Sequence, residues 1–139
     1  MAVIEIRDNK SDQVLARHVS ADEWDKGGLQ FYSKDDEYLQ VGTWVYDAGK
    51  QLLAHAHHDV RREITRTHET LYVKRGRIEA RVYNEARELV DTREVREGEL
   101  LTLMWGGHGY TILENGSQVL EIKNGPYVGA ERDRVRFEG

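Results

Sequence analysis

The sequence predicts an all-β fold, and three observations support this prediction. Short runs rich in β-branched and aromatic residues recur along the chain, at intervals of about 8–12 residues. Glycine, asparagine or aspartate turns separate most of these runs. Helix signals are nearly absent after Gly28. Short strands with turns between them are typical of a β-sandwich or a β-barrel.

The N-terminal segment predicts two short strands and one helical turn. An alternation of apolar and charged residues begins at Val3, and a second apolar run surrounds Leu15. Ser20 and Glu23 have the spacing of a capping box, in which the two side chains bond to the backbone at a helix start. We therefore expect a turn of helix through Trp24 that ends at Gly27.

The remainder of the chain predicts further strands, of which two have distinctive patterns. Apolar and charged residues alternate strictly in 77–83, so Ile78, Ala80 and Val82 should face the core. The nearly continuous apolar run 100–105 predicts a strand that is buried on both faces. The expected strands are Leu39–Tyr46, Leu71–Lys74, Arg77–Tyr83, Glu88–Val95, Leu100–Trp105, Tyr110–Leu113 and Val119–Lys123.

Composition limits the class of protein. The 139 residues predict a single domain over 1–139, and 39% apolar with 32% charged residues indicate a soluble chain. There is no apolar run long enough for a membrane span, and the N-terminus does not resemble a signal peptide. Cysteine is absent, which is compatible with a cytoplasmic protein. A net charge of −5 argues against general nucleic-acid binding.

The stretch from Gly49 to Gly76 concentrates residues that can bind a metal. It contains four of the six histidines, and the carboxylate of Glu69 follows directly after the last of them. His55 and His57 are two apart, so on a strand they would project to the same face. Without cysteine, imidazole and carboxylate are the available ligands. The pattern predicts a site for a divalent metal such as Fe, Mn, Ni, Zn or Cu.

The spacing within this stretch resembles the first motif of the cupin family. Gly49, His55, His57, Glu69 and Gly76 match that motif, except that the eleven residues between His57 and Glu69 form a longer interval than the family's. Residues 98–108 resemble the second motif, with His108 at a slightly shorter interval and Met104 in place of the usual proline. The ending GPYVGAERDRVRF resembles bacterial cupins associated with sugar and polysaccharide metabolism.

The resemblance covers about residues 38–124 and implies a single-domain jelly-roll β-barrel with the metal inside. It implies that His55, His57, Glu69 and His108 hold the metal. It also implies a homodimer, for which no stretch of the sequence specifies an interface.

Other residues are candidates for contact with a substrate. The loop that the long interval adds contains Arg61, Arg62 and Arg66, which could clamp an anionic group or could form a solvated charged turn. Aromatic residues could line a pocket or could belong to the core or a dimer interface. From these sets we select Arg61, Arg66 and Trp105 as substrate-binding residues, and Tyr72 and Tyr110 as catalytic residues.

Three functions remain open from the sequence. The first is a metal-dependent enzyme that acts on a small sugar or a hydroxy or oxo acid, by isomerisation, epimerisation or oxygenation. The second is a metal-free sugar epimerase or isomerase, in which His57 or His108 is the base and Tyr72 or Tyr110 the acid. The third is a non-catalytic protein that binds a sugar or a metal.

Overall fold

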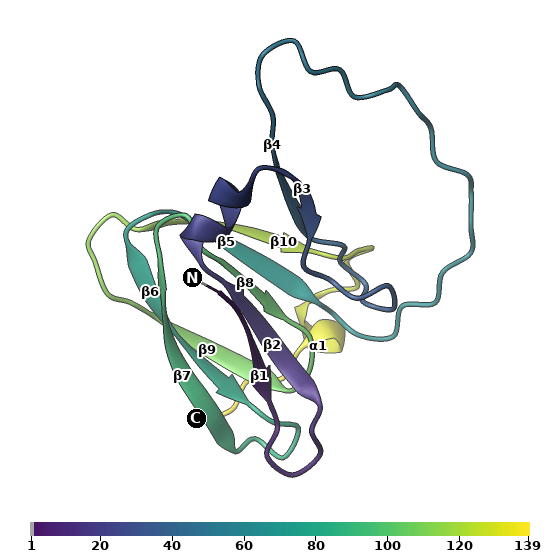
Figure 1. Cartoon of the computed structure of the whole chain (residues 1–139). Helices are drawn as coiled ribbons and strands as arrows, with labels where there is room; N and C mark the ends of the chain where they lie inside the picture. The colour runs from purple at the N-terminus through teal and green to yellow at the C-terminus, as the bar shows by residue number, and fades with distance from the viewer. Residues whose placement is uncertain (1) are drawn as a thin grey trace.

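A computed structural model describes residues 2–139 and shows an all-β protein (Figure 1). The prediction of the all-β class is confirmed. Ten strands form three antiparallel groups. A short 3₁₀ segment, η1 (Ala21–Lys26), follows β2, and a four-residue helix, α1 (Ala130–Asp133), lies near the C-terminus. None of the described helices is long and apolar enough to cross a membrane.

Two sheets enclose the core, and a separate hairpin lies outside it. The five-stranded sheet has the order β1 (Val3–Arg7), β2 (Val14–Val19), β8 (Leu100–Leu103), β5 (Glu69–Arg75), β10 (Gln118–Lys123). The three-stranded sheet has the order β7 (Leu89–Arg96), β6 (Arg77–Tyr83), β9 (Gly107–Ile112). The hairpin consists of β3 (Gly28–Phe31) and β4 (Gly42–Val45).

The core lies between the two sheets, where the alternation of the sequence places it. On β6, Ile78, Ala80 and Val82 are buried, as predicted. Every residue of β8 is buried, which agrees with the continuous apolar run. Leu101 and Leu103 pack in the core, while Leu100 and Thr102 face the opposite side of the sheet, under the chain that follows β2.

The chain passes from one sheet to the other at Gly76, the only residue between β5 and β6. Its φ of +82° lies in the left-handed region, which favours glycine. A Cβ at this position would also collide with Ser117. The sequence predicted two strands that meet at this glycine, and the structure adds that they belong to different sheets.

The predicted helical turn is present as η1, but its predicted capping box is wrong. Ser20 precedes η1, but its side chain makes no cap bond to the helix backbone and instead bonds to Asp22 and the backbone of Ala2. The segment is a 3₁₀ turn of six residues that ends at Gly27, where the sequence predicted the end. Strand β3 was not predicted, since Gly27 and Gly28 read as a helix end and its four residues give too short a pattern.

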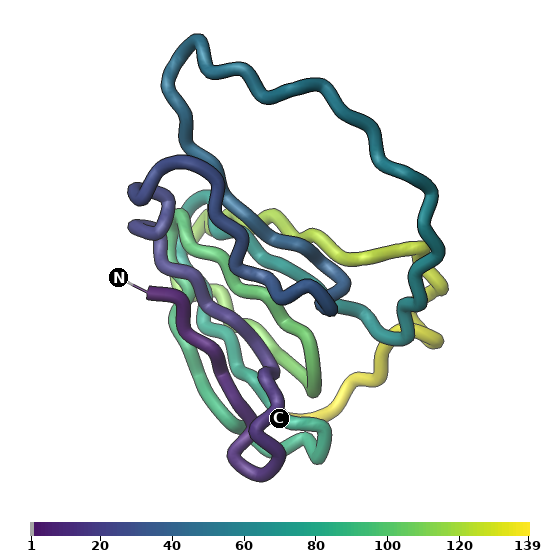
Figure 2. Tube along the Cα trace, turned by 45° about the vertical axis from the view of Figure 1, so that its right-hand side comes forward, coloured from purple at the N-terminus to yellow at the C-terminus, as the bar shows by residue number. Residues whose placement is uncertain are grey.

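The expected closed barrel is not what residues 2–139 form, because no strand of one sheet pairs with a strand of the other. Strands β9 and β10 are the outer edges there, and neither has a second strand partner. Residues 46–65, here called the arm, lie in no strand or helix. The arm arches away from both sheets (Figures 1 and 2) and is exposed along its whole length. The sequence had placed His55 and His57 on a strand, which the structure does not show.

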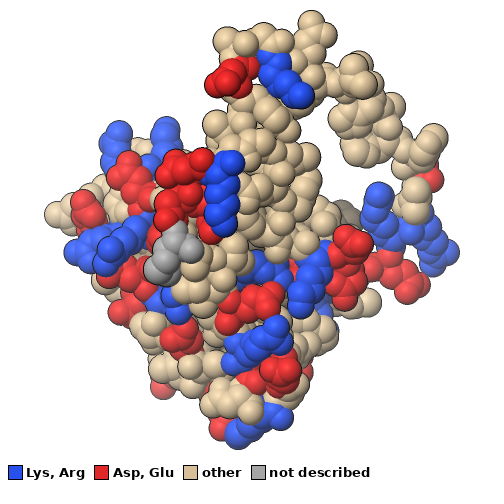
Figure 3. All heavy atoms as spheres, in the orientation of Figure 1, with Lys and Arg blue, Asp and Glu red and all other residues tan. Residues whose placement is uncertain are grey.

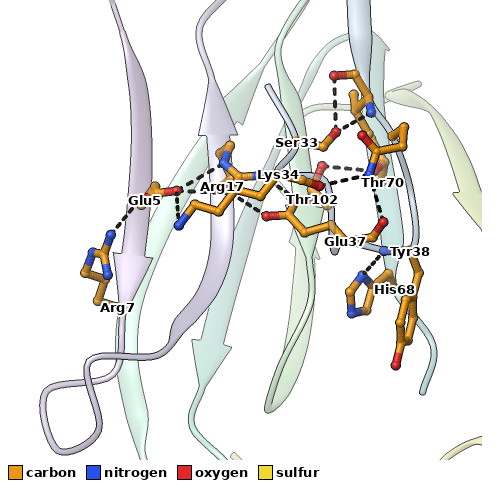
Figure 4. A network of polar contacts seen from close by, with 12 residues as sticks. Glu5, Arg7, Arg17, Ser33, Lys34, Glu37, Tyr38, His68, Thr70 and Thr102 are labelled. Atoms are coloured by element: carbon orange, nitrogen blue, oxygen red, sulfur yellow. Dashed lines mark hydrogen bonds and ion pairs between the residues drawn. The ribbon is translucent and has the colours of Figure 1, made fainter. Parts of the chain in front are cut away.

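A buried ionic network fixes the loop that leads into β4 (Figure 4). The Arg17 guanidinium on β2 donates two hydrogen bonds of 2.7 Å to the Glu37 carboxylate and a third to Glu5. The side chains of Arg17 and Glu37 are only 4% and 10% exposed. The hydrogen bond to Glu37 is the largest of the effects that raise the pKa of Arg17. Charges this deeply buried stabilise a fold only while they remain paired.

We predict that Arg17→Met lowers the free energy of unfolding by about 3–5 kcal/mol, because it leaves Glu5 and Glu37 without their buried cation. Urea unfolding followed by circular dichroism measures the loss. The matched control is Lys10→Met, which removes an exposed cation paired with Glu88 and should cost far less, because solvent screens exposed ion pairs. Equal losses in the two variants would contradict a structural role for the buried pair.

Candidate functional site

The candidate site lies at the open side of the molecule, between β9 and β10. A cavity of about 940 Å³ opens there, within the size range of small-molecule sites. Strands β5, β9 and β10 contribute to its walls, together with the turn between β8 and β9 and the C-terminal tail. The core is exposed at this side, where Ile112 on β9 is 61% accessible although it pairs with the buried Ile78.

Strand register places three candidate residues on the inner faces of the two sheets. Glu69 lies on β5 two residues before the core residue Leu71, so both side chains project to the same side. His108 and Tyr110 on β9 pair with Val82 and Ala80 of β6, whose side chains lie in the core. Directly paired residues share a face of the sheet. The three side chains therefore meet where the two sheets face each other.

These three side chains contact one another. The Tyr110 hydroxyl donates a hydrogen bond of 2.8 Å to Oε1 of Glu69, and Nε2 of His108 lies 3.3 Å from the same oxygen. Glu69 and Tyr110 come from different sheets, so this hydrogen bond ties the sheets together at the mouth of the cavity. The carboxylate is 6% exposed, which shields the contact from water.

The contacts shift two pKa values in opposite directions. Burial alone would raise the pKa of Glu69, but the hydrogen bonds and charge of His108, the Tyr110 hydroxyl and Lys123 together outweigh it and lower the pKa. Burial first, and then the charge of Glu69, raise the pKa of Tyr110 far above its ordinary value. At neutral pH, Glu69 is therefore an ionised acceptor and Tyr110 a protonated donor.

A glycine turn positions the histidine and the tryptophan beside it. Gly106 lies between β8 and β9 with a φ of +74°. A Cβ there would collide with the carbonyl oxygen of Tyr83, so only glycine allows the backbone to pass. This turn sets the direction of Trp105 before it and of His108 after it. The tight bend alone explains why glycine is needed at position 106, and a bound ligand is not required to explain it.

Trp105 and Arg66 form a stacked pair at the same cavity. The guanidinium carbon of Arg66 lies 2.9 Å from the centroid of the Trp105 ring. The Asn124 side chain holds the backbone at Arg66 and at His68, since it donates to the Arg66 carbonyl and accepts from the His68 amide. Two of the three predicted substrate-binding residues, Arg66 and Trp105, line the cavity that contains Glu69, His108 and Tyr110.

The other predicted site residues lie elsewhere. His55 and His57 are on the exposed arm with their rings 5.1 Å apart, and neither lines the cavity. Arg61 is also on the arm, and its side chain is 90% exposed. Tyr72 projects from the opposite face of β5 into an apolar cavity of about 350 Å³, where it contacts Trp24. Only half of the predicted metal ligands are thus brought together.

The described donors do not amount to a metal site in this conformation. Among residues 2–139, no three His, Cys, Asp or Glu side chains form a group that could hold a metal ion. Glu69 and His108 offer the donor types that a divalent metal takes, but they are two where a stable protein site takes at least three. His55 and His57, the other two ligands that the cupin resemblance implies, are on the arm.

Sequence reasoning missed several basic residues of the cavity. Lys123 pairs with Glu69 across the β5–β10 ladder, and Arg134 and Arg136 reach the cavity from the C-terminal tail. Lys123 could have been found, because β10 was predicted and its alternation puts Val119, Glu121 and Lys123 on one face. Nothing in the sequence of the charged tail indicates that it folds back to this cavity.

Comparison of the chain with protein-family models, with curated proteins and with solved structures found no match.

We predict that Tyr110→Phe lowers the free energy of unfolding at pH 7 by about 1–3 kcal/mol, because the buried Glu69 carboxylate loses a hydrogen-bond donor. The folded-state pKa of Glu69 lies below its unfolded value of 4.5, so the stability it confers is present above pH 4.5. That stability is lost as the pH falls through the folded-state pKa. The difference between wild type and variant should therefore shrink in acid.

Chemical denaturation of metal-free protein at a series of pH values measures this difference. Tyr72→Phe is the matched control, because its hydroxyl has no hydrogen-bond partner among the described residues and it lies on the other face of β5. A Tyr110→Phe loss that does not change between pH 7 and pH 3 would contradict the pairing with an ionised carboxylate.

Proposed function

We propose that the chain is a cupin-type jelly roll that binds a divalent metal at Glu69 and His108 and acts on a small sugar or a hydroxy or oxo acid. The observation that carries the proposal is the convergence of Glu69, His108 and Tyr110 at the mouth of a cavity of ligand size. Two of the four ligands implied by the cupin resemblance are in this group. Isomerisation, epimerisation and oxygenation remain the candidate reactions.

The remaining two ligands, His55 and His57, would reach the site if the arm closed over the open side. Three observations support closure. Strands β9 and β10 each have a free edge that a further strand could join. Between Lys50 and Asp59 the arm carries no Lys, Arg, Asp or Glu, and Figure 3 shows it as a largely uncharged stretch. Leu52 and Leu53 are 50% and 85% exposed, which is unfavourable in water.

The C-terminal end of the arm is already held close to the site, since Thr65 lines the cavity. Tyr38 stacks on His68 with ring centroids 4.4 Å apart (Figure 4). The Tyr38 hydroxyl bonds to Thr65 at the end of the arm. The backbone amide of Tyr38 donates to Nδ1 of His68. Closure would therefore move residues 46–64 about a C-terminal end that is already held beside the cavity. A closed arm would add the strand that the sequence predicts for His55 and His57.

We predict that the purified protein binds one divalent metal per chain. Replacement of His55, His57 or His108 by Ala, or of Glu69 by Gln, should weaken metal binding at least tenfold, because each removes a ligand. Elemental analysis and competition with a chelator of known affinity measure stoichiometry and affinity. His58→Ala is the matched control, since His58 lies on the same exposed arm without the ligand spacing. No stoichiometric metal, or an equal effect of His58→Ala, would contradict the proposal.

The second candidate is a metal-free sugar epimerase or isomerase. The contact between His108 and Glu69, with Tyr110 bonded to the same carboxylate, favours it, because a base and a hydroxyl already share one cavity. His108 would be the base. The raised pKa of Tyr110 makes this hydroxyl a hydrogen-bond donor rather than a ready proton source.

The two candidates differ in their response to a chelator. A metal-free enzyme should keep its turnover of a sugar substrate after dialysis against a chelator, and His108→Ala should abolish that turnover. Loss of turnover in chelator, with recovery on addition of one metal, would exclude the metal-free candidate. A sugar that raises the melting temperature but is recovered unchanged would support a protein that only binds its ligand.

The homodimer implied by the cupin resemblance stays a prediction. The β3–β4 hairpin supports it, because Leu29, Phe31 and Trp44 lie on one face of the hairpin and are each more than half exposed. An exposed apolar face of this kind marks a surface that another protein chain covers.

A further inference from the structure

The cavity beside Glu69 is basic in a chain that is acidic overall. Six basic side chains line it, against four carboxylates, while the whole chain has a net charge of −5. The basic residues are Arg66, Arg81, Arg87, Lys123, Arg134 and Arg136. Of these, Arg87, Arg134 and Arg136 have no ion-pair partner among residues 2–139. An excess of positive charge in a concave site attracts anions.

Arg66 is the one of these cations that stacks on a tryptophan ring. Its guanidinium lies flat on the Trp105 ring, and Asn124 holds its backbone. Among residues 2–139 its one ion pair is with Glu85, at 3.7 Å, and the Glu85 side chain is 62% exposed. Stacking occupies the faces of the guanidinium and leaves the N–H groups along its edges directed outward. Two N–H groups on one edge of the guanidinium match a planar carboxylate, which accepts two parallel hydrogen bonds from them.

Glu69 gives another part of the cavity a different character. Its carboxylate lines the cavity, accepts a hydrogen bond from the Tyr110 hydroxyl and lies 3.3 Å from Nε2 of His108. A ligand's anionic group is repelled there, but ligand hydroxyl groups can donate to the carboxylate. Arg66 precedes Glu69 by three residues, so the two Cα atoms are at most about 11 Å apart. The cavity therefore offers a cationic end and an acceptor end within reach of one small molecule.

We propose that this cavity selects a hydroxylated carboxylic acid, such as a sugar acid, whose carboxylate binds the edge of the Arg66 guanidinium while its hydroxyl groups face Glu69. The inference rests on the proposed function for the identity of the site, and it narrows the proposed substrates, a small sugar or a hydroxy or oxo acid, to hydroxylated carboxylic acids. Trp105 is a positioning residue that holds Arg66 flat.

The test is calorimetric titration of the full chain with D-glucuronate and with D-glucose, which share a ring and differ at the carboxylate. D-glucuronate should bind at least tenfold more tightly than D-glucose, and added salt should weaken it. Arg66→Lys should remove most of this preference, because it keeps the charge and loses the planar fork. Arg77→Lys is the matched control, since Arg77 pairs with Glu94 and does not line the cavity.

Several outcomes would overturn the inference. These are equal affinity for D-glucuronate and D-glucose, unchanged selectivity in Arg66→Lys, or binding of D-glucose 6-phosphate as tight as that of D-glucuronate, which would assign the site to phosphate. Trp105→Phe provides a second variant, and it should weaken D-glucuronate binding less than Arg66→Lys does.

Each titration is made with metal-free protein and with protein whose metal content has been measured. Selection of D-glucuronate without stoichiometric metal would support the carboxylate site and contradict the proposed metal function. Stoichiometric metal without selection of D-glucuronate would support the proposed metal function and contradict the carboxylate site.

Discussion

The Glu69 carboxylate is the interaction on which the candidate site depends. It lies on the five-stranded sheet, accepts a hydrogen bond from Tyr110 of the three-stranded sheet, and contacts His108 of the same strand as Tyr110. A buried carboxylate without such donors would have a large desolvation penalty. The hydrogen bond to Glu69 therefore joins the two sheets at the open side. The cavity lies around this carboxylate.

The same side of the molecule combines features that a closed core would not retain. Ile112 and Val119 project from the inner faces of β9 and β10, yet they are 61% and 36% exposed. The apolar part of the arm is also in water. Two exposed apolar surfaces on one chain, next to two free strand edges, favour their association. Arm closure would cover both apolar surfaces and would bring His55 and His57 towards Glu69.

Much of the fold could be predicted because its local signals are strong. The alternation in 77–83 and the continuous apolar run at 100–103 define β6 and β8, and Gly76 marks the passage between sheets. The site was predicted in part, since Glu69, His108, Tyr110, Arg66 and Trp105 meet at one cavity. The sequence could not show that Tyr72 faces the opposite side of β5, because that depends on which face each sheet buries. It also could not show the return of the C-terminal tail, which has no periodic pattern.

The proposed function depends on where the arm lies when metal is bound. A crystal structure of metal-loaded protein with anomalous scattering data shows the positions of the arm and the metal directly. We expect one anomalous peak within bonding distance of Glu69 and His108, with residues 51–58 paired along the free edge of a sheet and both His55 and His57 at the metal. A peak remote from Glu69, or an arm that stays extended around a metal-loaded site, would contradict the proposed function.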